Sequence, residues 1–124
     1  MPENQVRVTI TLSDPELKEE ELLKAVKNLQ SEADNIQGVE ADLISIAEAP
    51  PGSKSLGTFL IDTFKAVVNI KKLPNLLKTL SHRLIGGQKI KIKAEGNNRK
   101  LDIEVGSPED VAKIMPEIDK FING

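Results

Sequence analysis

The chain has 124 residues, no cysteine, one histidine and a formal net charge of −2. Its length and its 39% hydrophobic and 29% charged residues predict a single folded domain over residues 1–124. The lack of cysteine excludes disulfides, thiolate metal sites and cysteine nucleophiles. The lack of tryptophan and tyrosine removes the usual stacking platforms for single-stranded nucleic acid.

The first part of the chain predicts a β-α-β unit. Residues 5–12 alternate between apolar and polar side chains, which predicts a half-buried strand. The Ser-Asp-Pro sequence at 13–15 predicts the start of a helix, and apolar spacing extends it to about residue 33. Residues 39–49 predict a second strand, and the slip in its alternation after residue 43 indicates either a bulge or burial on both faces of a central strand. A right-handed crossover would make these strands parallel neighbours.

The stretch of residues 50–85 is the most hydrophobic part of the chain. The Pro-Pro-Gly sequence at 50–52 breaks the chain, and the apolar spacing over 56–70 predicts a helix. Pro74 restarts a second helix, whose apolar face is expected to continue to Ile85. The longest apolar stretch contains two charged residues and is shorter than the roughly 20 residues that a membrane span needs.

The last part of the chain predicts an antiparallel hairpin and a final helix. Residues 88–94 and 100–105 alternate strictly on either side of a turn at 95–99. The sequence Ser-Pro-Glu-Asp at 107–110 predicts a capped helix start. Pro116 is expected to kink that helix or to end it early.

The element order β-α-β-α(α)-β-β-α predicts an α+β fold. We expect a two-layer sandwich with a four-stranded mixed sheet and helices mainly on one face. The first two strands should be parallel neighbours, and the last two should form the hairpin. A ferredoxin-like arrangement is plausible, but its order is βαββαβ, which this series does not match.

Charge is distributed unevenly along the chain. Residues 1–50 hold four basic and eleven acidic residues, residues 51–94 hold nine and one, and residues 95–124 hold four and seven. The basic stretch predicts a surface for an acidic protein partner or for self-association. Cross-strand pairing of the hairpin lysines with Asp102 and Glu104 is the structural alternative. The candidate surface consists of Lys54, Lys65, Lys71, Lys72, Lys78, Arg83, Lys89, Lys91 and Lys93.

The sequence predicts no catalytic, metal or cofactor residues. Ser81, His82 and Asp62 are the residue types of a hydrolytic triad, but adjacent helical residues point about 100° apart and no nucleophile elbow is present. Gly52 and Gly57 flank a predicted helix start, where exposed amides could hold an anion. This turn is the basis of an alternative function, a domain that binds a small ligand or a nucleotide for regulation.

Several segments resemble those of a known family. They are DPELK at 14–18, EAPPGSKSLG at 48–57, the two expected helices LGTFLIDTFKAVV at 56–68 and LPNLLKTLSHRL at 73–84, QKIKIKAEGNNRKLDIEV at 88–105 and SPEDVAKIM at 107–115. Over about residues 5–122 the chain is similar to the first class of the effector-associated constant component family of bacteria. The resemblance rests on hydrophobic spacing and a few glycine and proline turns, without a catalytic signature.

The resemblance implies a non-catalytic adaptor without cofactors. Such domains couple an effector, such as a caspase-like or trypsin-like peptidase, to other components of a bacterial immunity or conflict system through protein–protein contacts. We expect a protein partner, no membrane association and little affinity for nucleic acid. The N-terminus has neither a basic leader nor an apolar signal core, so a cytoplasmic location is expected.

Overall fold

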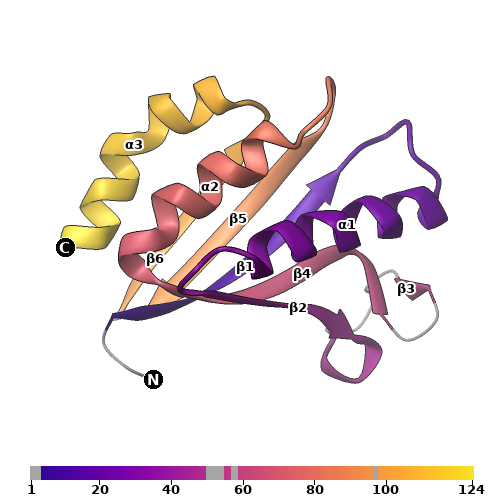
Figure 1. The fold of residues 1–124 in the computed structure, drawn as a ribbon, viewed down its shortest axis with the longest axis horizontal. Helices are drawn as coiled ribbons and strands as arrows, with labels where there is room; N and C mark the ends of the chain where they lie inside the picture. The colour runs from indigo at the N-terminus through magenta and orange to yellow at the C-terminus, as the bar shows by residue number, and fades with distance from the viewer. Residues whose placement is uncertain (1–3, 50–54, 57–58, 97) are drawn as a thin grey trace.

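The computed structural model of the chain shows one antiparallel sheet with three helices packed on the same face (Figure 1). It describes residues 4–49, 55–56, 59–96 and 98–124. The strands are β1 Gln5–Ser13, β2 Val39–Ser45, β3 Ser55–Leu56, β4 Phe59–Asn69, β5 Lys89–Gly96 and β6 Arg99–Val105. The helices are α1 Glu19–Asp34, α2 Leu73–His82 and α3 Pro108–Asn123, with short 3₁₀ turns at Ile46–Glu48 and Ile70–Lys72.

The strand order in the sheet is β2-β4-β1-β5-β6, and β3 pairs with the first residues of β4. Every pair is antiparallel, so β1 and β2 point the same way with β4 inserted between them. The series from β1 to β5, with the short β3 set aside, is β-α-β-β-α-β, the ferredoxin-like or split β-α-β arrangement. A further strand, β6, and helix α3 extend it. The predicted α+β class is confirmed. The predicted two-layer sandwich with a four-stranded mixed sheet is wrong, because the sheet has six strands in antiparallel pairs and β1 and β2 are not neighbours.

The cause of this error is β4, which the sequence had predicted as a helix. Phe64, Ala66 and Val68 are buried, while Lys65 and Val67 between them are half-buried and face the other way. That is the two-residue period of a strand, and the segment also holds four β-branched residues. Four of its buried residues, Leu60, Ile61, Phe64 and Val68, are also three or four positions apart or adjacent, which fits a helical spacing equally well.

Helix α1 begins later than the sequence predicts. The carboxylate of Asp14 accepts a hydrogen bond from the backbone N–H of Glu16 at 2.9 Å, and Leu17 N–H donates to the carbonyl of Asp14 at 3.3 Å. These bonds close a separate turn, because an aspartate side chain offers the backbone an alternative to helical bonding. The helix therefore starts at Glu19, without a side-chain cap.

Helix α2 ends earlier than predicted. Its leucines at 76, 77 and 80 are buried, as the apolar spacing indicated, but the last helical residue is His82. The predicted continuation of the apolar face to Ile85 is wrong, since Ile85 lies in the following loop and is 71% exposed.

The predicted hairpin and final helix are confirmed. The slip in the alternation of β2 corresponds to a shift in its pairing register, and the alternative of a central strand is wrong, because β2 lies at the end of the strand order. The β5–β6 pairing runs from Ile90–Val105 to Gly96–Arg99, and the register of β2 shifts between Leu43 and Ser45. In α3 the Ser107 hydroxyl accepts from the N–H of Asp110, and the helix continues past Pro116 to its end at Asn123. The proline therefore does not stop it.

The core lies between the sheet and the helices. Inward residues of β1, β5 and β6 meet the leucines of α2 and the apolar side of α3 in one continuous cluster. Burying one such side chain fully stabilises the fold by about 1.5–3 kcal/mol. Among the described residues, no helix is both long and apolar enough to cross a membrane.

Candidate functional site

The sheet face opposite the helices is left open by the fold (Figure 1). Alternation along each strand sends one set of side chains into the core and the other set to this open face. Exposed or half-buried residues therefore occupy every second position of β1, β5 and β6. No helix or strand of the described residues covers them.

Strand pairing arranges these residues in rows that run across the sheet. The row through Thr9 reads, from β2 to β6, Asp42, Lys65, Thr9, Lys93 and Asp102. Side chains directly opposite each other on neighbouring strands lie close enough to interact. The row thus places two cations around the Thr9 hydroxyl and one acid at each edge of the sheet.

The next row has a different charge order. It reads Glu40, Val67, Arg7, Glu95 and Lys100 from β2 to β6. Both rows hold as many acids as bases, so the open face is not uniformly basic. The central strands β4 and β1 nevertheless carry only cationic or uncharged residues in these rows.

Two ion pairs lie at or beside the open face. Lys89 and Glu104 are 3.7 Å apart, which supports the predicted cross-strand pairing of the hairpin. Lys65 pairs with Glu48 from the 3₁₀ turn after β2. The hydrogen bond from Lys65, with a smaller one from Ser45, holds the pKa of the Glu48 carboxyl below its ordinary value. Both pairs are well exposed, so each contributes little to stability.

The middle of the open face is hollowed on both sides of Thr9. One recess of about 410 Å³ lies between Arg7, Lys65 and the acids of β2. A second recess of about 290 Å³ lies between Arg7, Lys93 and Glu95. Both share Arg7 and Thr9, because the short Thr9 side chain stands between longer ones. A groove lined by charged side chains, by their apolar stems and by Val67 therefore crosses the central strands.

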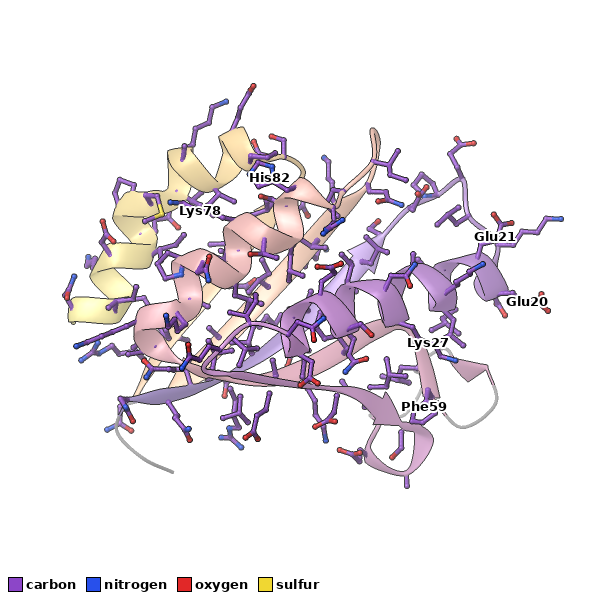
Figure 2. The ribbon with its side chains drawn as sticks, viewed as in Figure 1. Glu20, Glu21, Lys27, Phe59, Lys78 and His82 are labelled. Atoms are coloured by element: carbon purple, nitrogen blue, oxygen red, sulfur yellow. The ribbon has the colours of Figure 1, made fainter. Side chains whose placement is uncertain are left out.

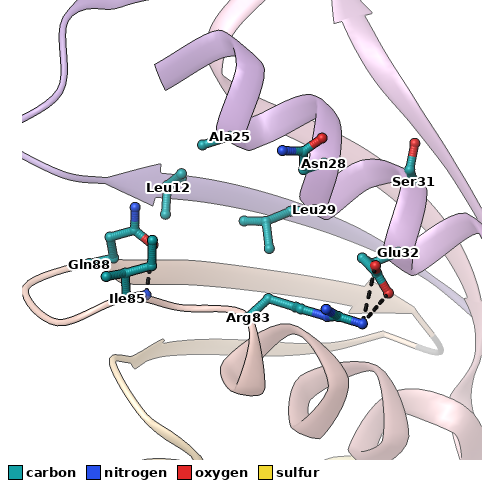
Figure 3. Close-up of a pocket in the computed structure, with 9 residues that line it drawn as sticks. All are labelled: Leu12, Ala25, Asn28, Leu29, Ser31, Glu32, Arg83, Ile85 and Gln88. Carbon is teal, nitrogen blue, oxygen red and sulfur yellow. Dashed lines mark hydrogen bonds and ion pairs between the residues drawn. The ribbon is translucent and has the colours of Figure 1, made fainter. Parts of the chain in front are cut away.

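The structure divides the predicted basic surface between two sides of the molecule. Lys65, Lys89, Lys91 and Lys93 lie on the open face. Lys71 and Lys72 lie in the turn before α2. On the helical side, Lys78 lies on α2 (Figure 2) and Arg83 follows its last residue (Figure 3). Lys54 is outside the described residues. Sequence reasoning did not single out Arg7 and Thr9, although their outward position in the alternation of β1 was visible.

The triad residue types serve structural roles. The Ser81 hydroxyl is buried and donates to the carbonyl of Lys78 in its own helix, while Asp62 accepts from the Thr63 hydroxyl. His82 is exposed at the end of α2. Gly52 and Gly57 lie outside the described residues, and Phe59–Asn69 after them is a strand, so this segment supplies no helix start for an anion. No group of metal-ligating side chains occurs within the described ranges.

A separate pocket lies on the helical side of the sheet, between α1 and the loop that follows α2 (Figure 3). It has a volume of about 350 Å³. An ion pair between Arg83 and Glu32 lies at one end, and Ile85 and Gln88 lie at the other. Sequence reasoning missed this pocket, because the predicted helix continued through Ile85.

Comparisons of the chain with protein-family models, with curated proteins and with solved structures found no match. The candidate sites therefore rest on the geometry of this chain.

Proposed function

We propose that this chain is a non-catalytic adaptor domain that binds a protein partner through the open face of its sheet. The observation that carries the proposal is the groove around Thr9, where Arg7, Lys65 and Lys93 surround a small side chain on an uncovered face. Regularly spaced charges on a rigid sheet give a partner a fixed pattern to match. Such patterns contribute to specificity and association rate more than to affinity.

The charge pattern indicates the chemistry of the partner. In the two rows, the inner strands carry three cations, Arg7, Lys65 and Lys93, and one acid, Glu95. The edge strands β2 and β6 carry three acids, Glu40, Asp42 and Asp102, and one base, Lys100. A matching partner has acidic residues at its centre and basic residues at its rim. Two copies of this chain meeting face to face would set their cationic centres against each other, so this mode of self-association is disfavoured.

The biological setting is proposed from the family resemblance. In that setting the partner is an effector, such as a caspase-like or trypsin-like peptidase, or another component of a bacterial immunity or conflict system in the cytoplasm. The domain would link the effector to that component through protein contacts alone.

Size-exclusion chromatography with light scattering tests this proposal, with the chain alone and mixed with the product of the adjacent gene. We expect a complex at low salt that weakens at high salt, since exposed charges are screened within about 8–10 Å at physiological salt. Arg7→Glu and Lys93→Glu should abolish the complex.

Lys78→Glu is the matched control. It makes the same charge change on an exposed residue of α2, on the opposite side of the molecule. A complex that survives both open-face reversals, or that Lys78→Glu disrupts equally, would rule out the open face as the docking surface.

A further inference from the structure

The pocket between α1 and the loop after α2 has the size of a small-molecule site. Its volume of about 350 Å³ falls within the range of roughly 300–1,000 Å³ that is typical of ligand pockets. Four of its residues, at 25, 28, 29 and 32, recur at the spacing that places them on one side of α1. The opposite wall comes from the loop between α2 and β5 (Figure 3).

One end of the pocket carries a cation and an anion side by side. Nη2 of Arg83 lies 3.3 Å from both carboxylate oxygens of Glu32. A guanidinium has five N–H donors, and this contact engages one nitrogen. The two side chains are 59% and 36% exposed, so the pair contributes little to stability and a ligand can separate it at small cost.

The floor of the pocket is apolar, whereas Asn28, Ser31 and Gln88 add polar groups to its lining. Leu12 and Leu29 are buried and form its floor beside Ala25 (Figure 3). Ile85 stands at the rim and is the one large apolar side chain that is well exposed within the described part of the chain. The exposed side chain of Ile85 is therefore in contact with water beside the apolar floor of the pocket.

The rim is held in place by a buried amide. The Gln88 carbonyl oxygen Oε1 accepts from the backbone N–H of Ile85 at 2.9 Å, and Nε2 donates to Asp14 at 3.0 Å. Gln88 is only 8% exposed. This bonding fixes the loop without a ligand, so binding would not have to order it.

We infer that this pocket binds a free α-amino acid with an aliphatic side chain. The ligand carboxylate meets Arg83, its ammonium meets Glu32, and its side chain covers Leu12 and Leu29 beneath Ile85. An amino acid carries both charges on one carbon, which matches the adjacent cation and anion. The site lies on the helical side of the sheet, so it is separate from the partner surface on the open face.

Titration of the ¹⁵N-labelled chain with L-leucine tests this inference by NMR. We expect saturable shifts of the backbone amides of Asn28, Glu32 and Ile85. Isoamylamine lacks the carboxylate, and 4-methylpentanoate lacks the ammonium group. Each should bind at least about tenfold more weakly than leucine, since one charge-assisted contact is lost. Glycine should also bind more weakly, because it leaves the apolar floor uncovered.

Matched variants locate the site. Arg83→Gln and Glu32→Gln should each weaken leucine binding by about tenfold or more, whereas Lys78→Gln on the exposed side of α2 should leave it unchanged. Arg83 and Lys78 are exposed and Glu32 is half-buried, so the variants should fold. Absence of saturable shifts in the wild-type chain, equal affinity for leucine and isoamylamine, or unchanged affinity in Arg83→Gln would each overturn the inference.

Discussion

The side chain of Gln88 donates a hydrogen bond to the carboxylate of Asp14 at 3.0 Å, although the two residues are 74 positions apart. Asp14 lies in the turn that delays the start of α1, and Gln88 lies just before β5. Their bond ties together two loops at the same end of the sheet. Because Gln88 also accepts from Ile85, one amide determines the shape of the loop that borders the α1–α2 pocket.

Gln88→Ala should destabilise the fold by about 1–3 kcal/mol. The substitution leaves the N–H of Ile85 and the Asp14 carboxylate without their side-chain partner, and orphaned polar groups carry a desolvation cost. Urea unfolding measures the change. Lys91→Ala, at an exposed position on β5, is the control and should stay within about 0.5 kcal/mol. Equal effects would show that the amide is not structurally important.

A lysine at two consecutive positions of β4 should give opposite results. Val68→Lys buries a charge in the core and should cost more than about 3 kcal/mol or prevent folding. Val67→Lys places the same side chain on the open face, between Glu40 and Arg7, where attraction and repulsion oppose each other, and it should change the unfolding free energy by less than about 1 kcal/mol. Similar losses at both positions would contradict the strand assignment of β4.

Gly96→Ala should destabilise the fold by about 1–3 kcal/mol. A methyl group at this position would lie 2.6 Å from Cγ1 of Val6 and 3.1 Å from the carbonyl of Gln5, so β1 and β5 would have to separate. Gly86→Ala is the control, since nothing lies within 4 Å of the added atom, and it should be neutral or slightly stabilising. Thermal unfolding of both variants compares them.

The Glu48–Lys65 pair should respond to acid. The pKa of Glu48 is lowered in the folded chain, chiefly by the hydrogen bond from Lys65 and secondarily by that from Ser45. The contribution of the pair is therefore complete above the unfolded glutamate pKa, about 4.3, and is lost as pH falls through the lower folded value. Carbon-detected NMR should show the Glu48 midpoint rising in Lys65→Gln. An unchanged midpoint would mean that the pair does not persist in solution.

Elements whose patterns are local could be predicted from the sequence. The β5–β6 hairpin alternates strictly around a short turn, and the capped start of α3 is encoded within four residues. The register shift in β2 was visible as a slip in its alternation. In each case the deciding information lies within a few neighbouring positions.

Elements decided by distant contacts could not be predicted. The apolar residues of β4 fit a helical spacing as well as a strand, and its pairing with β1 and β2 on either side decides between them. The α1–α2 pocket depends on Glu32 and Arg83, which are 51 positions apart. The basic residues were predicted to form one surface because residues 56–70 were expected to be a helix. This segment is strand β4 instead, and it places Lys65 on the open face, away from the basic residues of α2.

The insertion of β4 between β1 and β2 also constrains how the chain can fold. Until residue 69 has left the ribosome, the first two strands have no partner that joins them, because they are not hydrogen-bonded to each other. Closing the sheet then requires contacts between segments more than fifty residues apart, which slows folding relative to proteins with mostly local contacts. The nascent N-terminal half consequently exposes two unpaired strands, and its protection from aggregation depends on the speed at which the middle of the chain is made.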